Sequence, residues 1–191
     1  MERIPPHILL GAYTEGVFPM ADKGEIHWFS PLMRGIIPLD DRFHIPHGLK
    51  KTLKKEVYRG EMNTAFIEVL NGCRDRDETW IDEVILDSYS HLFDLGYCHS
   101  FESWDEDGLQ GGLYGVAIGR AFFGESMFSL KPDASKVALV QLVNWLREND
   151  FILLDTQWMT DHLRQFGGYE LPRPQYLKLL AEALAEDGDD V

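Results

Sequence analysis

Apolar residues recur at helical spacing in several parts of this chain. The clearest case is the stretch from 79 to 96, where apolar side chains return every three or four residues and would cover one face of a helix. Thr79 is expected to cap this helix, with Asp82 three residues later, and Gly96 is expected to follow its last turn. The same kind of pattern predicts further helices over 6–14, 47–56, 63–73, 133–149, 160–166 and 173–187.

Between residues 98 and 128 the apolar spacing changes to the period of two that β-strands have. This pattern predicts three antiparallel strands joined by hairpin turns, over 98–104, 109–119 and 121–128. A buried strand is expected over 151–157. The region 17–40 is rich in aromatic residues and prolines, so we expect it to be extended, as strand or loop.

The order of these elements is that of an α+β protein. By analogy, it matches the GNAT-like acyltransferase fold, in which helices flank a mainly antiparallel central sheet and the central strands splay to admit an acyl donor. We expect a small N-terminal subdomain over residues 1–33 and a GNAT-like catalytic domain over 34–191. The last residues, 186–191, are expected to be frayed.

The formal net charge of −14 argues against sequence-blind coating of nucleic acid, because phosphate binding needs local positive potential. A basic patch nevertheless lies between residues 42 and 59, a segment that contains six basic side chains and only one acidic side chain, Glu56. Its members are Arg42, Lys50, Lys51, Lys54, Lys55 and Arg59. The patch is either an ordinary solvated face or a phosphate-backbone contact, and we favour the contact in so acidic a protein.

The start of the helix over 133–149 is a second candidate for anion binding. Free backbone N–H groups there and the side chain of Lys136 would both favour phosphate. An ordinary N-cap, made by Asp133 or Ser135, explains the same residues equally well.

Several classes of protein lose support from what the sequence lacks. Cys73 and Cys98 have no CxxC spacing and no histidine cluster nearby, so we expect buried reduced thiols and no metal site. The N-terminus does not have the pattern of a signal peptide, and no apolar stretch reaches membrane-spanning length, so we expect a cytoplasmic protein. The motifs of nucleotide hydrolysis and dinucleotide binding are missing as well.

Three polar side chains at the ends of two predicted strands are the candidates for chemistry. Glu125 lies in an apolar strand, and Asp155 and Gln157 share one face of the next strand. One crossover helix separates the two strands, and such connections tend to place strands side by side. We therefore expect Glu125, Asp155 and Gln157 to converge on one cleft and to act in catalysis.

Each carboxylate also has a structural interpretation, which taken singly is the more common one. Glu125 would then accept hydrogen bonds from a neighbouring loop, and Asp155 would cap the helix that starts near Thr160. The aromatic and methionine side chains around Glu125 are by default part of the core. The combination of three polar residues shifts the balance toward function.

Seven short motifs in this order resemble one family. They are "AYTEGVFPM", "HWFSPLMRGIIPL", "TWI", "GGLYGVAIG", "FFGESMFS", "ASKVAL" and "LLDTQ", followed by "HLRQFG" and "ELPRPQYL". Together they are similar to the leucyl/phenylalanyl-tRNA-protein transferases of bacteria across nearly the whole chain. The family often has a longer N-terminal segment before the first motif, and Met20 stands where the family usually has tryptophan.

The resemblance implies transfer of leucine or phenylalanine from aminoacyl-tRNA to the α-amine of proteins that begin with Arg or Lys, which marks them for N-end-rule degradation. It also implies roles in binding the donor side chain and terminal adenosine for Tyr13, Met20, Trp80, Tyr89, Phe122 and Met127. Asp155 and Gln157 would handle the incoming amine. No cofactor is implied, and we favour a monomer.

This chemistry is consistent with the missing motifs, because an aminoacyl ester is already activated and its transfer needs neither ATP nor a metal. We expect Asp155 to orient Gln157, whose carbonyl would accept a hydrogen bond from the amine, while Glu125 would bind polar groups at the mouth of an apolar pocket. A coenzyme-A-dependent N-acetyltransferase is the second interpretation, although "SLKPDASK" lacks its glycine-rich loop. A non-catalytic module that binds RNA or degradation signals is the third.

Overall fold

The strands predicted between residues 98 and 128 form the centre of a seven-stranded sheet. The computed structural model describes residues 3–75 and 79–185, and the tail expected to be frayed lies outside them. The strands are β1 (Phe18–Asp22), β2 (Glu25–Phe29), β3 (Met33–Ile37), β4 (Arg59–Met62), β5 (Cys98–Asp105), β6 (Gly108–Ile118), β7 (Ala121–Ser129), β8 (Leu153–Gln157) and β9 (Tyr169–Pro172). The helices are α1 (Pro6–Thr14), α2 (His47–Lys54), α3 (Phe66–Arg74), α4 (Glu83–Asp94), α5 (Ala134–Glu148), α6 (Asp161–Arg164) and α7 (Arg173–Leu184).

The order of strands in the sheet is β4-β5-β6-β7-β8-β3-β9, and every neighbouring pair is antiparallel except β7 and β8. That parallel pair is the expected result of the crossover through α5. The α+β fold with a mainly antiparallel sheet is therefore confirmed.

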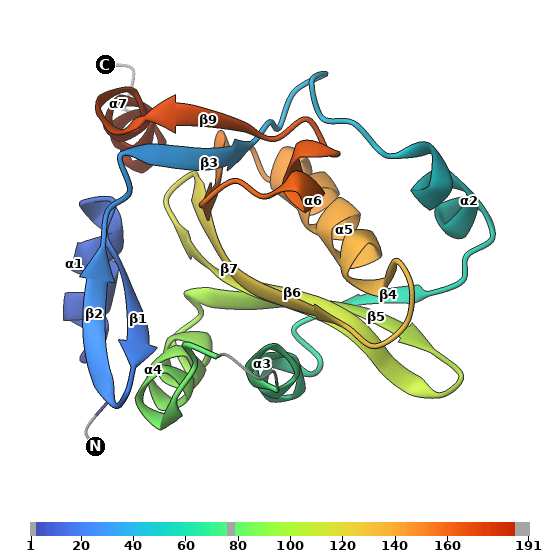
Figure 1. Cartoon of the computed structure of the whole chain (residues 1–191), viewed down its shortest axis with the longest axis horizontal. Helices are drawn as coiled ribbons and strands as arrows, with labels where there is room; N and C mark the ends of the chain where they lie inside the picture. The colour runs from blue at the N-terminus through green and yellow to red at the C-terminus, as the bar shows by residue number, and fades with distance from the viewer. Residues whose placement is uncertain (1–2, 76–78, 186–191) are drawn as a thin grey trace, which may run out of the picture.

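Helices cover both faces of this sheet and close two hydrophobic cores. Figure 1 shows α5 on one face of the central strands and α3 and α4 on the other. The core under α5 contains Leu142, Leu146 and Phe122, and the opposite core contains Val69, Tyr89 and Phe123. Phe122 and Phe123 point into different cores because adjacent side chains of a strand alternate between faces.

The N-terminal region joins this framework in two ways. Strands β1 and β2 form a separate two-stranded hairpin, whereas β3 is inserted in the main sheet between β8 and β9. Helix α1 buries Leu9 and Tyr13 in the same core as Tyr89. The division at residue 33 stays a prediction.

Some local predictions are confirmed and others are wrong. The α4 helix ends before Gly96 as expected, but its N-cap is Asp82, which accepts a hydrogen bond from the backbone N–H of Ile85 (2.9 Å). Thr79 is therefore not the cap; its hydroxyl accepts from Ile81 N instead. Asp155 does not cap α6, because the cap of that helix is Thr160. The short strands β4 and β9 were not predicted, since four residues are too few for a clear alternation.

Candidate active site

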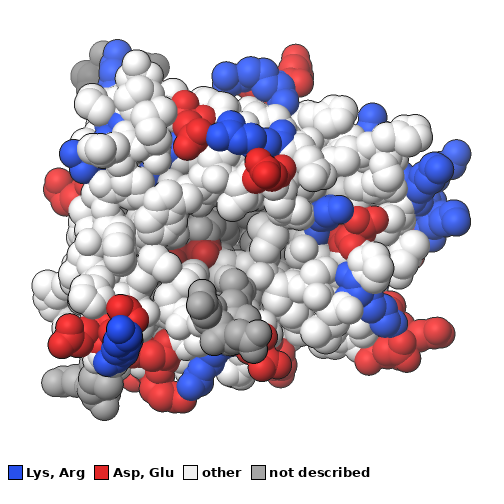
Figure 2. All heavy atoms as spheres, in the orientation of Figure 1, with Lys and Arg blue, Asp and Glu red and all other residues white. Residues whose placement is uncertain are grey.

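A cavity of about 280 Å³ opens where two neighbouring strands separate. Strands β7 and β8 pair only from Ala121 opposite Leu153 to Phe123 opposite Asp155, and beyond that point they diverge. The apolar wall is built by Leu113, Met127, Leu139, Leu142, Leu154 and Leu163. Trp80, Tyr114 and Glu125 also line the cavity, which therefore joins side chains from both faces of the sheet. Figure 2 shows a hollow near the middle of one face of the molecule, with atoms of an acidic side chain in it.

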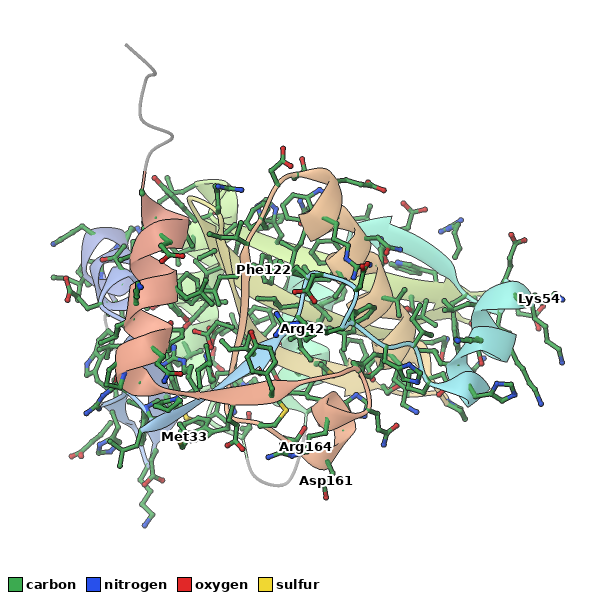
Figure 3. All side chains as sticks on the ribbon, turned by 90° about the horizontal axis from the view of Figure 1, so that it is seen from above. Met33, Arg42, Lys54, Phe122, Asp161 and Arg164 are labelled. Carbon is green, nitrogen blue, oxygen red and sulfur yellow. The ribbon has the colours of Figure 1, made fainter. Side chains whose placement is uncertain are left out.

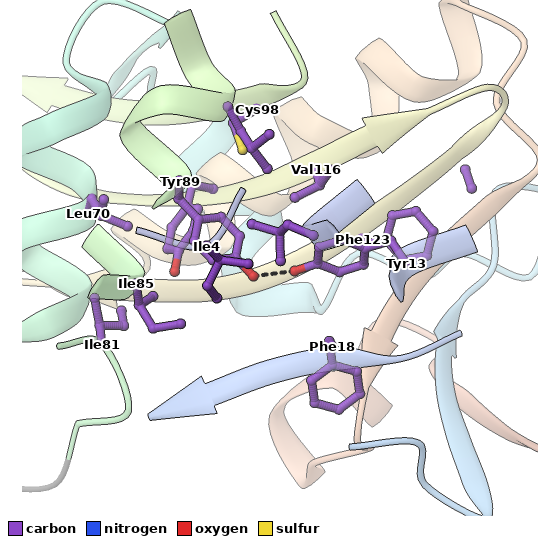
Figure 4. Close-up of a cluster of buried hydrophobic side chains, with 14 of the residues drawn as sticks. Ile4, Tyr13, Phe18, Leu70, Ile81, Ile85, Tyr89, Cys98, Val116 and Phe123 are labelled. Atoms are coloured by element: carbon purple, nitrogen blue, oxygen red, sulfur yellow. Dashed lines mark hydrogen bonds between the residues drawn. The ribbon is translucent and has the colours of Figure 1, made fainter. Parts of the chain in front are cut away.

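Glu125 stands at this cavity and is held by three side chains. Its Oε1 accepts hydrogen bonds from the hydroxyl of Tyr13 (2.6 Å) and from Nε2 of Gln157 (3.0 Å). Its Oε2 has a longer contact of 3.4 Å with the hydroxyl of Tyr89. The Tyr13 and Tyr89 hydroxyls also bond to each other, as Figure 4 shows. These contacts bring α1, α4, β7 and β8 together at one carboxylate.

The environment of Glu125 changes its acidity. Burial disfavours the charged form and raises the pKa of the carboxyl to about 7, although the hydrogen bonds from Tyr13 and Gln157 oppose the rise. Burial and the nearby Glu125 charge likewise raise the pKa values of the Tyr13 and Tyr89 hydroxyls well above their usual value, so both hydroxyls stay protonated. The site thus holds one carboxyl that titrates near neutral pH.

Asp155 is a carboxylate of a different kind, because a buried arginine neutralises it. Arg34 Nε lies 2.9 Å from Asp155 Oδ1, and Arg34 Nη2 lies 2.7 Å from Oδ2. The hydroxyl of Tyr176 donates to Oδ2 (2.7 Å), and the backbone N–H of Gln157 donates to Oδ1 (2.8 Å). Asp155 is fully buried and Arg34 is 1% exposed. Neither Asp155 nor Gln157 is among the described residues that line the cavity, so only Glu125 of the three expected side chains borders it.

Gln157 connects the two carboxylates. Its backbone N–H bonds to Asp155 and its side-chain amide bonds to Glu125. Its φ angle of 65° lies in the left-handed region, which is uncommon for a residue other than glycine. Asp155 therefore contacts Gln157 through the backbone N–H of Gln157.

Three residues that line the same cavity each carry a buried polar atom without a hydrogen-bond partner in the described part of the chain. The atoms are the Tyr114 hydroxyl, Thr156 Oγ1 and His162 Nε2. Leaving a buried polar atom unpaired costs on the order of 1–3 kcal/mol, so small movements that turn these atoms toward a polar ligand would be favourable. Burial also lowers the pKa of His162, which favours a neutral imidazole.

The residues expected to bind the donor lie at different depths. Trp80 and Met127 line the cavity. Tyr13 and Tyr89 lie behind it as partners of Glu125 and are fully buried. Phe122 is packed in the core under α5 and is not a lining residue. Met20 lines a neighbouring hollow of about 600 Å³, together with Phe29, and Trp80 lines both that hollow and the cavity.

The basic residues expected to contact tRNA divide into two groups. Lys50, Lys51, Lys54 and Lys55 are exposed on and just after α2, which Figures 1 and 3 place at the far end of the molecule from α7. Figure 2 shows basic side chains gathered at that end. Arg42 pairs with Asp40 (2.7 Å) and Arg59 pairs with Glu61 (2.9 Å), so both charges are compensated by acids just outside the counted segment.

Lys136 also forms an ion pair with a nearby acid. Its Nζ lies 3.0 Å from Oδ1 of Asp133, whose other oxygen accepts from Thr52 (2.8 Å). Asp133 is the N-cap residue of α5, so a phosphate at this helix start would meet a carboxylate. This arrangement disfavours an anion site here, and with it the coenzyme-A-dependent interpretation, which needs a pyrophosphate site before this helix.

Sequence reasoning missed several residues of the site. Arg34 and Tyr176 hold Asp155, and Tyr114, Thr156 and His162 face the cavity. The signal for Arg34 was a lone arginine inside the apolar run "LMRGII", since a buried cation requires an anionic partner. No comparable signal marks Tyr114, because a tyrosine in a strand is usually core.

The described residues give two further findings. No helix among them is long and apolar enough to cross a bilayer. They also contain no group of three or more His, Cys, Asp or Glu side chains arranged to hold a metal ion. Cys73 and Cys98 are buried thiols that form no disulfide, as expected.

Known proteins are similar to this chain over almost its full length. A protein named leucyl/phenylalanyl-tRNA–protein transferase from Akkermansia muciniphila is 56% identical over 190 residues, covering 97% of this chain and 98% of the relative. Its namesake from Herpetosiphon aurantiacus is 47% identical, covering 96% of each. Among solved structures, FemX has the same fold, with a TM-score of 0.55 at 11% identity, over 91% of this chain and 70% of FemX.

The family match covers both parts of the chain. Residues 2–32 match the N-terminal domain of the leucyl/phenylalanyl-tRNA protein transferases, and residues 36–181 match the main domain. With the FemX likeness, the GNAT-like fold class is confirmed. The chain belongs to the leucyl/phenylalanyl-tRNA protein transferase family.

Proposed function

We propose that the cavity between β7 and β8 is the place where this transferase joins an aminoacyl ester to a protein α-amine. The enzyme adds leucine or phenylalanine to protein N-termini in the N-end rule pathway. Its acceptors begin with Arg or Lys, and the reaction takes place in the cytoplasm. The observation that carries the assignment is one titratable carboxylate, Glu125, beside an apolar cavity open between two diverging strands.

The donor side chain binds against the leucine-rich wall of the cavity. A cavity of about 280 Å³ is large enough for a leucine or phenylalanine side chain, and Glu125 is the one charged side chain among the described residues of its wall. The unpaired atoms of Tyr114, Thr156 and His162 are then available to the ester and amine of the donor. The terminal adenosine lies toward Trp80, which borders both the cavity and the hollow lined by Met20.

The acceptor amine attacks the ester carbonyl carbon, a C–N bond forms, and the ester C–O bond breaks to release the ribose hydroxyl of the tRNA. An α-amine has a reference pKa of about 7.7 to 8.0, so part of it is neutral near pH 7. The Gln157 amide donates through Nε2 to Glu125, which leaves its carbonyl oxygen to accept from the amine. Glu125 takes the proton that the amine loses and returns it to the leaving oxygen, either directly or through the neighbouring ribose hydroxyl.

Positioning accounts for most of the expected acceleration. Holding ester and amine in the correct orientation is worth on the order of 7–11 kcal/mol in well-oriented reactions. Neither a metal nor a covalent enzyme intermediate is required, because the ester is already reactive. Asp155 contributes by fixing Gln157, since its own oxygens are occupied by Arg34 and Tyr176.

The body of the tRNA contacts four lysines on and just after α2. Lys50, Lys51, Lys54 and Lys55 are exposed, and no ion pair with them is found among the described residues. The paired side chains of Arg42 and Lys136 contribute less, because phosphate must compete with Asp40 and Asp133.

One assay tests the function and the site together. Labelled leucyl-tRNA is mixed with a peptide that begins with Arg, with an otherwise identical peptide that begins with Glu, and, separately, with acetyl-coenzyme A as donor. We expect labelling of the Arg peptide from leucyl-tRNA alone. Glu125→Ala and Asp155→Ala should reduce this transfer by about a hundredfold or more while circular dichroism stays native. Full activity in both variants would contradict the site assignment without touching the family assignment.

A further inference from the structure

We propose that Arg34 is a positioning residue for this site: it turns Asp155 into a fixed acceptor for the Gln157 backbone and so aims the Gln157 amide at Glu125. The inference deepens the proposed function and rests on it. It assigns a role to Arg34, which does not line the cavity among the described residues, and it gives Asp155 a role other than proton acceptor.

The surroundings of Arg34 fix its guanidinium on every side. Strand β3 places it next to β8, where Nε and Nη2 bond to the two oxygens of Asp155. Nη1 donates to the carbonyl oxygen of Gly16 (2.8 Å), directly after α1. The guanidinium also lies over the ring of Phe18 (4.8 Å) and the ring of Tyr176 (4.4 Å). A planar cation with all its faces and edges in contact has little freedom to move.

Asp155 is correspondingly saturated. Oδ1 receives Arg34 Nε and the Gln157 N–H, and Oδ2 receives Arg34 Nη2 and the Tyr176 hydroxyl. A carboxylate with a bidentate arginine and two further donors has both oxygens occupied and is held in one orientation. It also lies outside the cavity. The geometry therefore suits a structural anchor and does not suit a base.

Asp155, as the anchor, stabilises a backbone conformation of Gln157 that would otherwise be unfavourable. Gln157 has a positive φ, a conformation that costs a non-glycine residue on the order of 1 kcal/mol or more. The Asp155 to Gln157 N–H bond stabilises this turn, and the turn directs the side-chain amide back to Oε1 of Glu125. Arg34, Asp155 and Gln157 thus form a chain of contacts that ends at the titrating carboxylate.

A pair of matched variants separates an anchor from a base. Asp155→Asn combined with Arg34→Gln removes both charges together but keeps an acceptor for the Gln157 N–H and leaves no unpaired buried ion. We expect Arg34→Gln alone, which leaves the Asp155 carboxylate without its cation, to lower kcat by about tenfold or more. The double variant should recover most of that loss and keep the wild-type pH profile, because Glu125 is intact. Wild-type kcat in Arg34→Gln alone, or a double variant no more active than Arg34→Gln, would overturn the proposal.

A second measurement does not depend on catalysis. Hydrogen exchange of the Gln157 backbone N–H should be slow in wild type and in the double variant, and at least about tenfold faster in Asp155→Ala, which lacks the acceptor. Tyr176→Phe, which keeps the arginine and the carboxylate, should exchange as slowly as wild type. Equal exchange in Asp155→Ala and wild type would contradict the anchor. If wild type failed to transfer leucine at all, the proposed function would fail, while the exchange result would still report on the anchor.

Discussion

Three buried carboxylates in this protein show how local surroundings decide what the same chemical group does. Glu102 accepts from the backbone N–H groups of Thr64 and Ala65 and from the Ser100 hydroxyl, which ties β5 to the start of α3. Asp155 is paired with Arg34. Glu125 has only hydroxyl and amide donors around it and borders a cavity. Glu102 also lacks a bonded cation, but of the three carboxylates only Glu125 lines the cavity, and this suits it to exchange a proton with a bound substrate.

The first prediction concerns the pH dependence of transfer. Below about pH 7 the wild-type rate requires both an ionised Glu125 and a neutral amine, so log kcat/KM should rise by about two units per pH unit. Glu125→Gln removes one of these ionisations, and the slope should fall to about one. Rates measured from pH 5.5 to 8.5 with the same peptide check this. An unchanged slope in Glu125→Gln would mean that Glu125 does not take the proton.

The second prediction concerns stability. The pKa of Glu125 is about 7 in the folded protein and near 4.5 when unfolded, so the unfolded chain loses this proton first as pH rises. The free energy of unfolding therefore decreases as pH rises from about 4.5 to 7, by up to on the order of 3 kcal/mol. Glu125→Gln cannot lose a proton, so its stability relative to wild type should increase across this range. Urea unfolding of both proteins at pH 5 and pH 7.5 measures the difference, and an equal difference at the two pH values would contradict it.

At the scale of elements, the divergence of β7 and β8 creates the site. A sheet normally leaves no space between paired strands, and here pairing stops at Phe123 and Asp155. The β6–β7 pair beside it shifts register between Tyr114 and Gly115, and a Cβ on Gly115 would lie 2.3 Å from the Phe123 carbonyl oxygen. Glycine is required there because the two backbones approach so closely. The bulge and the divergence together place Tyr114 and Glu125 at the same cavity.

The third prediction belongs to helix α2. Lys50→Glu with Lys54→Glu should weaken tRNA binding and flatten its dependence on salt, because fewer counterions are released when fewer phosphates are bound. Each lost contact lowers the slope of log K against log salt by about 0.9. Filter binding of leucyl-tRNA at several salt concentrations measures the slope.

Lys178→Glu is the matched control for a single Lys54→Glu, since Lys178 is an exposed lysine on α7. The control should leave the salt slope near that of wild type. If the two single variants behave alike, the effect is one of total charge and the tRNA lies elsewhere.

At the scale of the whole molecule, the cavity unites residues from distant parts of the chain. Trp80 precedes α4, Leu113 is in β6, Leu142 is in α5 and Leu163 is in α6. Glu125 in turn depends on Tyr13 of α1, 112 residues away. The site therefore exists only when the N-terminal helix, the meander and the C-terminal half are packed together.

The fourth prediction uses this cavity to alter donor choice. Leu142→Phe narrows the space, so transfer of phenylalanine should fall by about tenfold more than transfer of leucine. Leu146→Phe is the matched control, because Leu146 is one turn further along α5 and is buried without lining the cavity. Competition between the two aminoacyl-tRNAs gives the ratio directly, independent of the folded fraction. The same ratio in both variants would place the donor side chain outside this cavity.

Much of the fold follows from local patterns. The helical spacing of α4, the alternation of β5 to β7 and the crossover through α5 depend on side chains near one another in sequence, and these predictions are confirmed. The first residue of a helix is harder to predict. Thr79 and Asp82 are both good N-cap residues, and the backbone conformation selects Asp82 as the cap of α4. The family resemblance, which sums many short motifs, is confirmed as well.

The sequence by itself determined most of the elements, the family and the convergence of Glu125 and Gln157, since strand periodicity and crossover topology fix which residues meet. Only the tertiary structure decided that Asp155 is paired with Arg34 and that Phe122 lies in the core. These outcomes depend on contacts between segments up to 121 residues apart. Pairing, burial and the resulting proton affinity are properties of the three-dimensional surroundings, and no local pattern along the chain encodes them.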